Sequence, residues 1–439
     1  MKKILILVML CLFVVACVAG CGPKGTVEDF GPYPEDNTAT PDDSSDAEGE
    51  AEPVTIKYYT WSDEETYAKI IVDSFNAIDP NVQVDLNVIP SLDDAYEDKI
   101  KVLLSGREEI DVLGMRREQQ MLQYADLGAL ADISSLITDF NLDISKYGPA
   151  FTKLEQDGQY FGLPYRNSCW FLIYNKDIFD AQGIDYPGQL TWDEYRDLAN
   201  QLTSGEGGDK IYGGYMVSWV LDIAAIQQGA TILDDDPTIS WEAVTLLKTL
   251  YEDPSHMSLA ELTATNSDWM AEFERGSVAM MPNGDWFIGM ILADEEAGKS
   301  DVNWDLAPLP VPEGVEDGTT FGHYTLVSMT EYCEHQDEAF SFMTYLAGEE
   351  GAKILAQRGM FPAYNTPAIE ESYITASGKD STNVLFQSIV LPETPVHPLY
   401  AQVADAFREE AELYIHGEKA LDDAKEDFLS RRAEILAGN

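Results

Sequence analysis

Hydrophobic and polar positions alternate in the first part of the chain in a way that predicts a layered α/β fold. Val54–Trp61 and Val82–Val88 alternate with a period of two, and Ile110–Gly114 is a short apolar run. Two stripes with helical spacing separate these strands. One follows Ser62–Glu65, which has the spacing of a capping box, and the other follows Ser91. Strand, helix, strand, helix, strand is the order of a right-handed parallel sheet.

The stretch from Tyr160 to Lys176 marks an expected crossing between two halves of the fold. Proline cannot donate to a sheet ladder, so we expect the chain to change element at Pro164, before a buried strand at Trp170–Tyr174. Between them stand an aromatic ring, a guanidinium, an amide, a hydroxyl and an indole, at Tyr165, Arg166, Asn167, Ser168 and Trp170. Such groups suit ligand binding. The alternative is an ordinary turn into a core strand.

The second half repeats the same pattern. Thr191–Glu194 is another capping box, and apolar stripes predict helices at Trp219–Gln228 and from Trp241 to Leu250. Further strands are expected at 211–217, 277–281, 303–309 and 324–329, followed by a helix near 339–346 and a helical tail over 400–436.

These elements predict an α/β fold with two lobes, each a sheet flanked by helices, and a ligand cleft between them. We expect a second crossing near Pro310 and Pro312. The expected first lobe comprises residues 54–163 and 310–362, and the second comprises 164–309 and 363–439.

The first twenty residues resemble a lipoprotein signal peptide. Lys2 and Lys3 precede an apolar run, Ile4–Val18, that is too short for a comfortable membrane span. Small residues then precede Cys21, whose thiol is the expected acylation point and membrane anchor. The alternative is a plain signal peptide in which Cys21 is incidental.

Residues 21–53 are expected to form an acidic, disordered tether. Pro, Gly, Ser, Thr, Asp and Glu dominate this stretch, so it cannot bury enough apolar surface to offset the entropy of ordering. As a coil, about 30 residues reach roughly 30 Å.

The charge balance excludes one class of partner. The chain carries 78 acidic and 27 basic residues, a formal net charge of −51. Affinity for phosphates needs clustered Lys and Arg, so we expect no nucleic-acid partner. An acidic surface keeps a protein soluble and weakly associating, and we expect a monomer.

The cysteines and histidines give no sign of a metal site, a cofactor or a catalytic motif. Cys169 and Cys333 are the cysteines of the expected exported domain, and we favour free buried thiols over a disulfide. The chain has no HExxH, no Gly-x-Ser-x-Gly and no glycine-rich phosphate loop. Asp234–Pro237 lacks the spaced ligands of an EF-hand and is expected to be a solvated turn. The enzyme alternative is an exported glycosidase using paired carboxylates, although close pairs arise by chance among 78 acids.

Several motifs, taken in order, resemble one family. They are the segments 160–164, 174–179 and 190–194, then Gly276–Met281 with Asn283–Trp286, then Phe321–Tyr324. This arrangement, over roughly residues 54 to 439, resembles the family 1 extracellular solute-binding proteins. These are maltose-binding-protein-like sugar-binding lipoproteins of ABC importers.

The resemblance implies a receptor that captures a carbohydrate, expected to be an oligosaccharide, closes by a hinge and delivers it to a permease. It maps ligand contacts to Trp61, Arg116, Arg166, Trp170, Trp219, Asn283, Asp285, Trp286, Phe321, Tyr324 and Phe361. A sugar ring stacks its C–H face on an aromatic ring, and its hydroxyls bind amides, carboxylates and guanidinium groups. Trp192, Trp241 and Trp304 fit core or surface packing better.

Two arginine positions suggest a hypothesis about ligand charge. Arg116 and Arg117 follow the strand Ile110–Gly114, and Arg166 lies at the crossing. Successive residues diverge after a strand, so we expect at most one of Arg116 and Arg117 to point inward. Arginines from both lobes could clamp a ligand carboxylate, as in a uronic-acid-containing oligosaccharide. The alternative is that they neutralise nearby acids or bind neutral hydroxyls.

Overall fold

The computed structural model describes residues 53–78, 80–91, 95–147, 151–265, 268–395, 397 and 399–438. The expected signal peptide, the lipidation site Cys21 and all of the expected tether except Pro53 lie outside these ranges.

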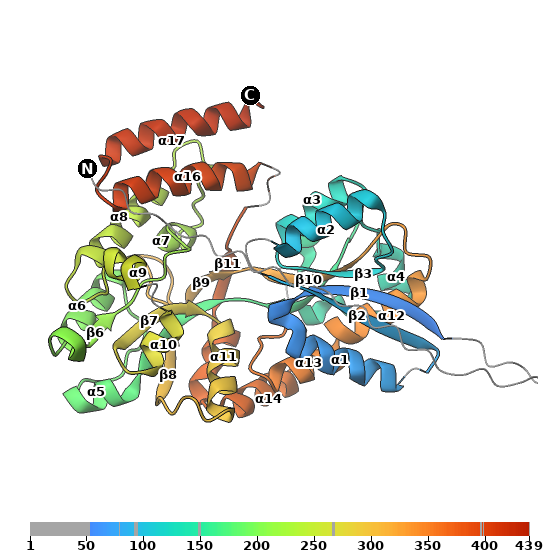
Figure 1. Cartoon of the computed structure of the whole chain (residues 1–439), viewed down its shortest axis with the longest axis horizontal. Helices are drawn as coiled ribbons and strands as arrows, with labels where there is room; N and C mark the ends of the chain where they lie inside the picture. Colours follow the sequence, from blue (N-terminus) through green and yellow to red (C-terminus); the bar gives the residue numbers. More distant parts are fainter. Residues whose placement is uncertain are drawn as a thin grey trace, which may run out of the picture. The chain divides into compact units, whose positions relative to one another are not determined.

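The first lobe is built on a five-stranded sheet with strand order β2-β1-β3-β10-β4. Four of these strands, β1, β2, β3 and β10, are labelled in Figure 1. β1 pairs in parallel with β2 and β3, whereas β10 is antiparallel to β3 and β4. The strands are β1 Val54–Trp61, β2 Val82–Ile89, β3 Val112–Met115, β4 Leu163–Asn167 and β10 Tyr324–Met329, and the helices are α1 Glu65–Ile78, α2 Ala95–Gly106, α3 Glu118–Asp126, α4 Ser134–Asp139, α12 Gln336–Ala347 and α13 Glu349–Ala356. The strand and helix order expected from the hydrophobic pattern is confirmed.

The capping box expected at Ser62 does not form. Ser62–Glu64 is a 3₁₀ turn, and α1 begins only at Glu65. The Ser62 hydroxyl oxygen accepts instead from the backbone N–H of Ser91, at 3.1 Å. The Ser62 hydroxyl oxygen, which would accept from a nearby N–H in a capping box, therefore accepts from a residue distant in sequence.

Pro164 does not end an element, contrary to expectation. It lies inside β4, which is the edge strand of the first sheet, beside an irregularity in the pairing between Thr325 and Leu326 of β10. An edge position tolerates a residue without an N–H. The crossing from the first sheet to β5 (Trp170–Asn175) therefore lies at Ser168–Cys169, a few residues after the boundary that we expect at residue 163.

The second lobe is built on a four-stranded sheet with strand order β6-β7-β5-β8. β5 is antiparallel to both β7 and β8, and the capping box at Thr191 is confirmed, with both of its hydrogen bonds present. The other strands are β6 Tyr212–Gly214, β7 Val278–Gly284 and β8 Trp304–Pro308, and the helices are α5 Lys176–Gln182, α6 Trp192–Leu202, α7 Ile223–Ile226, α8 Thr238–Glu252, α9 Leu259–Thr265, α10 Trp269–Glu274 and α11 Trp286–Glu296.

The helix expected at Trp219–Gln228 is reduced to the four residues of α7. The carbonyl of Trp219 accepts a hydrogen bond from the Arg408 guanidinium at 2.9 Å, so it is engaged outside any helical ladder. Short 3₁₀ turns complete the local structure, at η3 Ile144–Tyr147, η4 Phe151–Leu154, η5 Gly207–Asp209 and η6 Asp380–Asn383.

A third, two-stranded sheet connects the lobes. β9 (Thr319–Gly322) pairs in parallel with β11 (Ile389–Pro392), and the chain returns to the first sheet at His323, just before β10. The second crossing is thus later than the expected boundary at residue 310, because the segment after β8 pairs with β11 before it returns. The carbonyl of Phe361 accepts from the N–H of Asn167, at 2.9 Å, so the segment around Phe361 is also joined to the end of β4.

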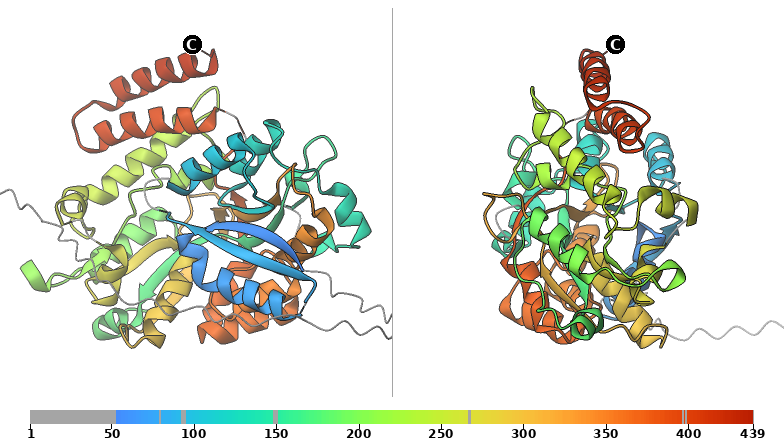
Figure 2. Two further views of the ribbon diagram at one scale, coloured as in Figure 1. Left: turned by 45° about the vertical axis from the view of Figure 1, so that its right-hand side comes forward. Right: turned by 90° about the vertical axis from the view of Figure 1, so that its left-hand side faces the viewer.

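The helical tail expected over 400–436 is confirmed, and it consists of two helices. α16 (Tyr400–Ile415) and α17 (Leu421–Leu436) pack together, and α16 contacts α8 of the second lobe. Figure 2 shows this pair at the edge of the domain. The remaining helices are α14 Pro367–Ser377 and α15 Val384–Gln387.

The two lobes have separate hydrophobic cores. One includes Ile56, Leu113 and Val327 of the first sheet, and the larger one includes Leu172 and Met281 of the second. Trp192, Trp241 and Trp304 are buried in the larger core, which confirms their expected packing role. A cleft between two independently packed lobes is where this architecture positions a ligand.

Candidate functional site: the interlobe cavity

A cavity of about 760 Å³ lies between the lobes, and we call it the interlobe cavity. Its volume is in the range of ordinary small-molecule sites, about 300–1,000 Å³. The lining mixes apolar and charged side chains. It comprises Trp61, Asp63, Glu64, Thr66, Tyr67, Arg116, Arg117, Arg166, Trp286, Gly289, Met290, Leu292, Ala293, Glu296, His323, Thr325, Gln357, Arg358, Met360 and Ala376.

Trp61 and Arg116 form the wall contributed by the first lobe. Trp61 is the last residue of β1, and Arg116 directly follows β3. These two strands are parallel neighbours, so their carboxyl ends meet at one edge of the sheet. The Arg116 guanidinium lies 5.2 Å from the centroid of the Trp61 ring, and its Nε is 3.2 Å from Glu97 Oε1. The cation therefore covers part of one indole face and is held there by a carboxylate of its own lobe.

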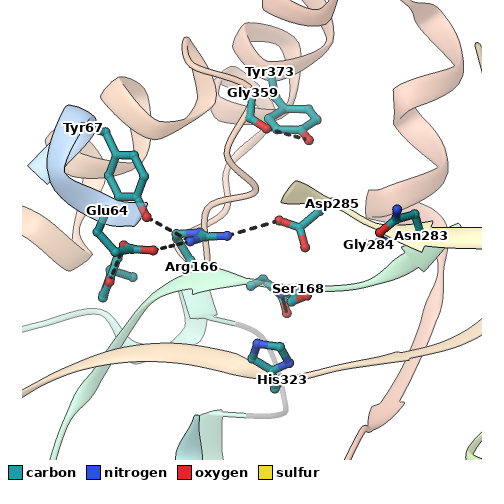
Figure 3. A network of polar contacts seen from close by, with 12 residues as sticks. Glu64, Tyr67, Arg166, Ser168, Asn283, Gly284, Asp285, His323, Gly359 and Tyr373 are labelled. Carbon is teal, nitrogen blue, oxygen red and sulfur yellow. Dashed lines mark hydrogen bonds and ion pairs between the residues drawn. The ribbon is translucent and has the colours of Figure 1, made fainter. Parts of the chain in front are cut away.

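A buried polar network forms the floor of the interlobe cavity (Figure 3). Arg166, on β4, pairs with Glu64 and also donates to the hydroxyl of Tyr67 at 2.9 Å. The second oxygen of Glu64 accepts from the hydroxyl of Tyr165 at 2.6 Å. Burial opposes the charge of Arg166, but Tyr67, Glu64 and Asp285 together hold its pKa well above the ordinary value. Arg166 therefore remains a cation despite its burial.

Asp285, in the second lobe, faces Arg166 across the crossing segment. Its Oδ2 lies 3.7 Å from Arg166 Nη2, and its backbone N–H donates to the Cys169 carbonyl at 3.0 Å. Burial raises the pKa of Asp285, and the attraction of Arg166 offsets this only in part.

Trp286 forms the wall contributed by the second lobe, at the start of α11. Its ring lies so close to Gly284 that a Cβ built there would be 2.1 Å from the indole. Trp170 meets it edge-on at 5.4 Å between ring centroids, and Phe321 stacks on Trp170 at 5.2 Å. The indole that lines the interlobe cavity thus rests on a buried aromatic support.

The structure brings four of the expected ligand-contact residues into the cavity lining, namely Trp61, Arg116, Arg166 and Trp286. Five others are buried behind the walls and are absent from the lining: Trp170, Asn283, Asp285, Phe321 and Phe361. Tyr324 lines a separate cavity of about 210 Å³ instead. Trp219 is 37% exposed and lies outside the lining, 6.3 Å from Trp170 between ring centroids.

Sequence reasoning missed several lining residues for an identifiable reason. Glu64 lies inside the spacing of the expected capping box, and Tyr67 fits the apolar stripe of the helix expected after it, so both residues already match a local pattern. His323 lies within the motif Phe321–Tyr324 but was not among the expected contacts. Met290 and Met360 carried no local signal, since only the packing of the lobes brings them to the cavity.

The expectation that at most one of Arg116 and Arg117 points inward is wrong, because both line the interlobe cavity. Arg116 packs over Trp61, whereas Arg117 reaches Glu393, with 3.1 Å between Nη1 and Oε1. Their long side chains let neighbouring residues reach the same space from different directions.

Each arginine of the lining has a carboxylate partner within the protein. Glu97 pairs with Arg116, Glu393 with Arg117, and Glu64 with Arg166, while Arg358 lies 4.0 Å from Glu296. The geometry therefore agrees with the alternative in which these arginines neutralise nearby acids.

Two further observations concern the described part of the chain. Cys169 and Cys333 are free and buried, as expected. Within those same residues, no helix is both long and apolar enough to cross a membrane.

Comparison with known proteins identifies the family. Residues 71–380 match the family described as bacterial extracellular solute-binding proteins. The chain belongs to this family. The expected resemblance and the two-lobed α/β fold are thereby confirmed.

This solute-binding protein has relatives among curated proteins and solved structures. It is 28% identical to a sugar transporter from Rhizobium etli, solved in an open conformation, with a TM-score of 0.77 over 87% of this chain and 99% of that one. It is 27% identical to the arabinooligosaccharide-binding protein of Halalkalibacterium halodurans, over 46% of each chain, so the match spans less than half of that relative. An uncharacterised lipoprotein of Streptomyces antibioticus is 26% identical over 67% of each chain.

Proposed function

We propose that this protein is the substrate-binding component of an ABC importer and captures an oligosaccharide in the interlobe cavity. The observation that carries the proposal is a cavity of about 760 Å³ with Trp61 on one lobe and Trp286 on the other. Two aromatic walls suit the C–H faces of sugar rings, and the polar floor suits their hydroxyls. The relatives described as sugar-transporting and arabinooligosaccharide-binding support this ligand class.

Ligand contacts to both lobes would favour a closed state over an open one. Closure is then a population shift about the crossings at Ser168–Cys169 and His323, and the closed form docks on a permease. In this proposal Trp61, Arg116, Arg166 and Trp286 face the ligand directly. The buried residues behind them support the walls.

The proposed ligand is a neutral carbohydrate. Every arginine of the cavity lining already has a carboxylate partner, so a uronic acid would have to displace one of them. Calorimetry with a neutral oligosaccharide and its uronide counterpart tests this point. Tight binding of only the uronide, weakened by salt, would contradict it.

A thermal-shift screen against a sugar panel tests binding itself. A ligand that binds only the folded protein raises the unfolding temperature by mass action. The protein incubated with its best sugar should return that sugar intact by mass spectrometry. Cleavage that follows the purified, folded protein would favour the glycosidase alternative, for which the family and the fold give no support.

We also propose that the protein is anchored outside the cytoplasm through lipid on Cys21, after removal of residues 1–20. The support is the run of small residues before Cys21 and the description of one relative as a lipoprotein. Metabolic labelling with a fatty acid should mark the wild-type protein and fail to mark Cys21→Ala. Labelling that persists in the variant would refute the assignment.

A further inference from the structure

The carboxylate of Asp285 is incompletely paired although it is wholly buried. Neither of its oxygens makes a hydrogen bond of normal geometry among the described residues, although the Ser168 hydroxyl and the Cys169 backbone N–H lie near enough to lower its pKa. The nearest cation is Arg166, but 3.7 Å between Nη2 and Oδ2 is too long for a hydrogen bond. A buried charge left in this state costs free energy, so the arrangement calls for an explanation.

Arg166 has an unused edge that matches this carboxylate. Its Nη1 is occupied by Glu64 and Tyr67, whereas its Nε has no hydrogen-bond partner in the described structure. Nε and Nη2 form one side of the guanidinium, and their two N–H groups have the spacing that binds both oxygens of a carboxylate. The two N–H groups of Arg166 and the two oxygens of Asp285 could therefore form a pair of hydrogen bonds if the side chains came closer together (Figure 3).

The two partners belong to different lobes. Arg166 lies on β4 of the first sheet, and Asp285 lies between β7 and α11 of the second lobe. The N–H of Asp285 is bonded to Cys169 at the crossing, so a hinge motion there changes the distance between the charges directly. The next residue is Trp286, whose indole lines the interlobe cavity.

We propose that Asp285 is a positioning residue that couples ligand binding to closure of the lobes. When the lobes close, its two oxygens accept from Nε–H and Nη2–H of Arg166, and this pairing seats Trp286 against the ligand. The inference rests on the proposed function, because it requires a ligand in the interlobe cavity. It assigns Asp285 to a contact with Arg166 rather than with the ligand.

The test uses the full-length protein with Asp285→Asn, which keeps the shape of the side chain and removes the charge. Arabinotriose, maltotriose and mannobiose are the probes. Charge-assisted hydrogen bonds correspond to a loss of affinity of about tenfold to a hundredfold. We expect this loss to appear mainly as faster dissociation, because the pairing forms in the closed state.

Stability of the ligand-free protein separates this role from a merely structural one. A neutral amide is easier to bury than a partly paired carboxylate, so Asp285→Asn should unfold at the same temperature as the wild type or higher. Glu272→Gln is a matched control, because Glu272 is also buried and pairs with an arginine, Arg275, within its own lobe. Its affinity for the probes should equal that of the wild type.

The outcomes are distinct. Unchanged affinity in Asp285→Asn, or a loss of affinity accompanied by a lower unfolding temperature, would overturn the inference. Failure of the wild type to bind any probe would overturn the proposed function and this inference with it. If Asp285→Asn does not fold, Arg166→Lys replaces it, since a single ammonium cannot bind both oxygens; full affinity in that variant would also overturn the inference.

Discussion

Substitution of Glu393 by glutamine should remove a pH-dependent part of the stability. Glu393 follows β11, and its side chain is only 8% exposed. One oxygen lies 3.1 Å from Arg117 Nη1 and the other 2.9 Å from His323 Nδ1. The carboxylate thus joins the first lobe to the connecting sheet, and both partners favour its charged form.

The magnitude follows from the pKa of this carboxyl group. Burial alone would raise it, but Arg117 and His323 outweigh burial and lower the pKa from 4.5 to about 2. At about 1.36 kcal/mol per pH unit, this shift corresponds to about 3 kcal/mol of folding free energy. Because the folded-state pKa is lowered, the contribution is complete above about pH 4.5 and is lost as the pH falls toward about 2.

The assay is urea unfolding of the wild type and Glu393→Gln between about pH 5 and about pH 3, where linkage predicts that the stability gap shrinks by about 2 kcal/mol. Burial, and then the charge of Glu393, raise the pKa of Asp222 to about 6, although the attraction of Arg408 lowers it. The range from about pH 5 to about pH 3 lies below this pKa. Asp222 is therefore largely protonated and adds little repulsion.

Asp73→Asn is the matched control, because its ion pair with Lys69 is exposed and should contribute little at any pH. A gap between the wild type and Glu393→Gln that stays constant, or grows as the pH falls, would refute the reasoning.

Three further predictions concern the cavity wall and one helix cap. Trp286→Ala should leave the fold intact and weaken sugar binding by about 1–3 kcal/mol, by analogy with stacking of bases on aromatic rings; calorimetry showing unchanged affinity would contradict its role in the wall. Gly284→Ala should also weaken binding, because the added Cβ would be 2.1 Å from the Trp286 ring, whereas Gly188→Ala, with no atom within 4 Å of its Cβ, should bind normally. Thr191→Ala should lose about 1 kcal/mol in urea unfolding because it removes a cap that forms. Ser62→Ala should lose clearly less, because Ser62 caps no helix and its bond to the Ser91 N–H is exposed to solvent; equal losses would argue against this distinction.

Features governed by neighbouring residues could be predicted from the sequence. The apolar run at Trp170–Tyr174 forms the buried strand β5, and the Thr191 capping box closes as its spacing indicates. The order of strands and helices in the first lobe was also predictable from the sequence, because periodicity reports which face of an element is buried. Among the candidate site residues, Trp61, Arg116, Arg166 and Trp286 were expected near the cavity and line it.

Features governed by partners distant in sequence could not be predicted. Pro164 is accepted inside β4 only because that strand lies at the edge of the sheet. The Ser62 hydroxyl accepts from the Ser91 N–H instead of capping a helix, and Glu64, which lies within the expected capping box, pairs with Arg166. In each case the local pattern allowed two outcomes, and a contact formed during folding selected one of them.

The sequence by itself determined most of the elements, the two-lobed class and a set of candidate ligand residues, because these depend on short-range periodicity, residue type and the order of the motifs. Tertiary structure alone decided which of those residues face the cavity and which support it. Trp286 and Asp285 are neighbours in the chain, yet one lines the cavity and the other is buried toward Arg166 of the opposite lobe. The physical reason is that burial and charge pairing at a junction between lobes depend on surfaces contributed by segments far apart in the sequence.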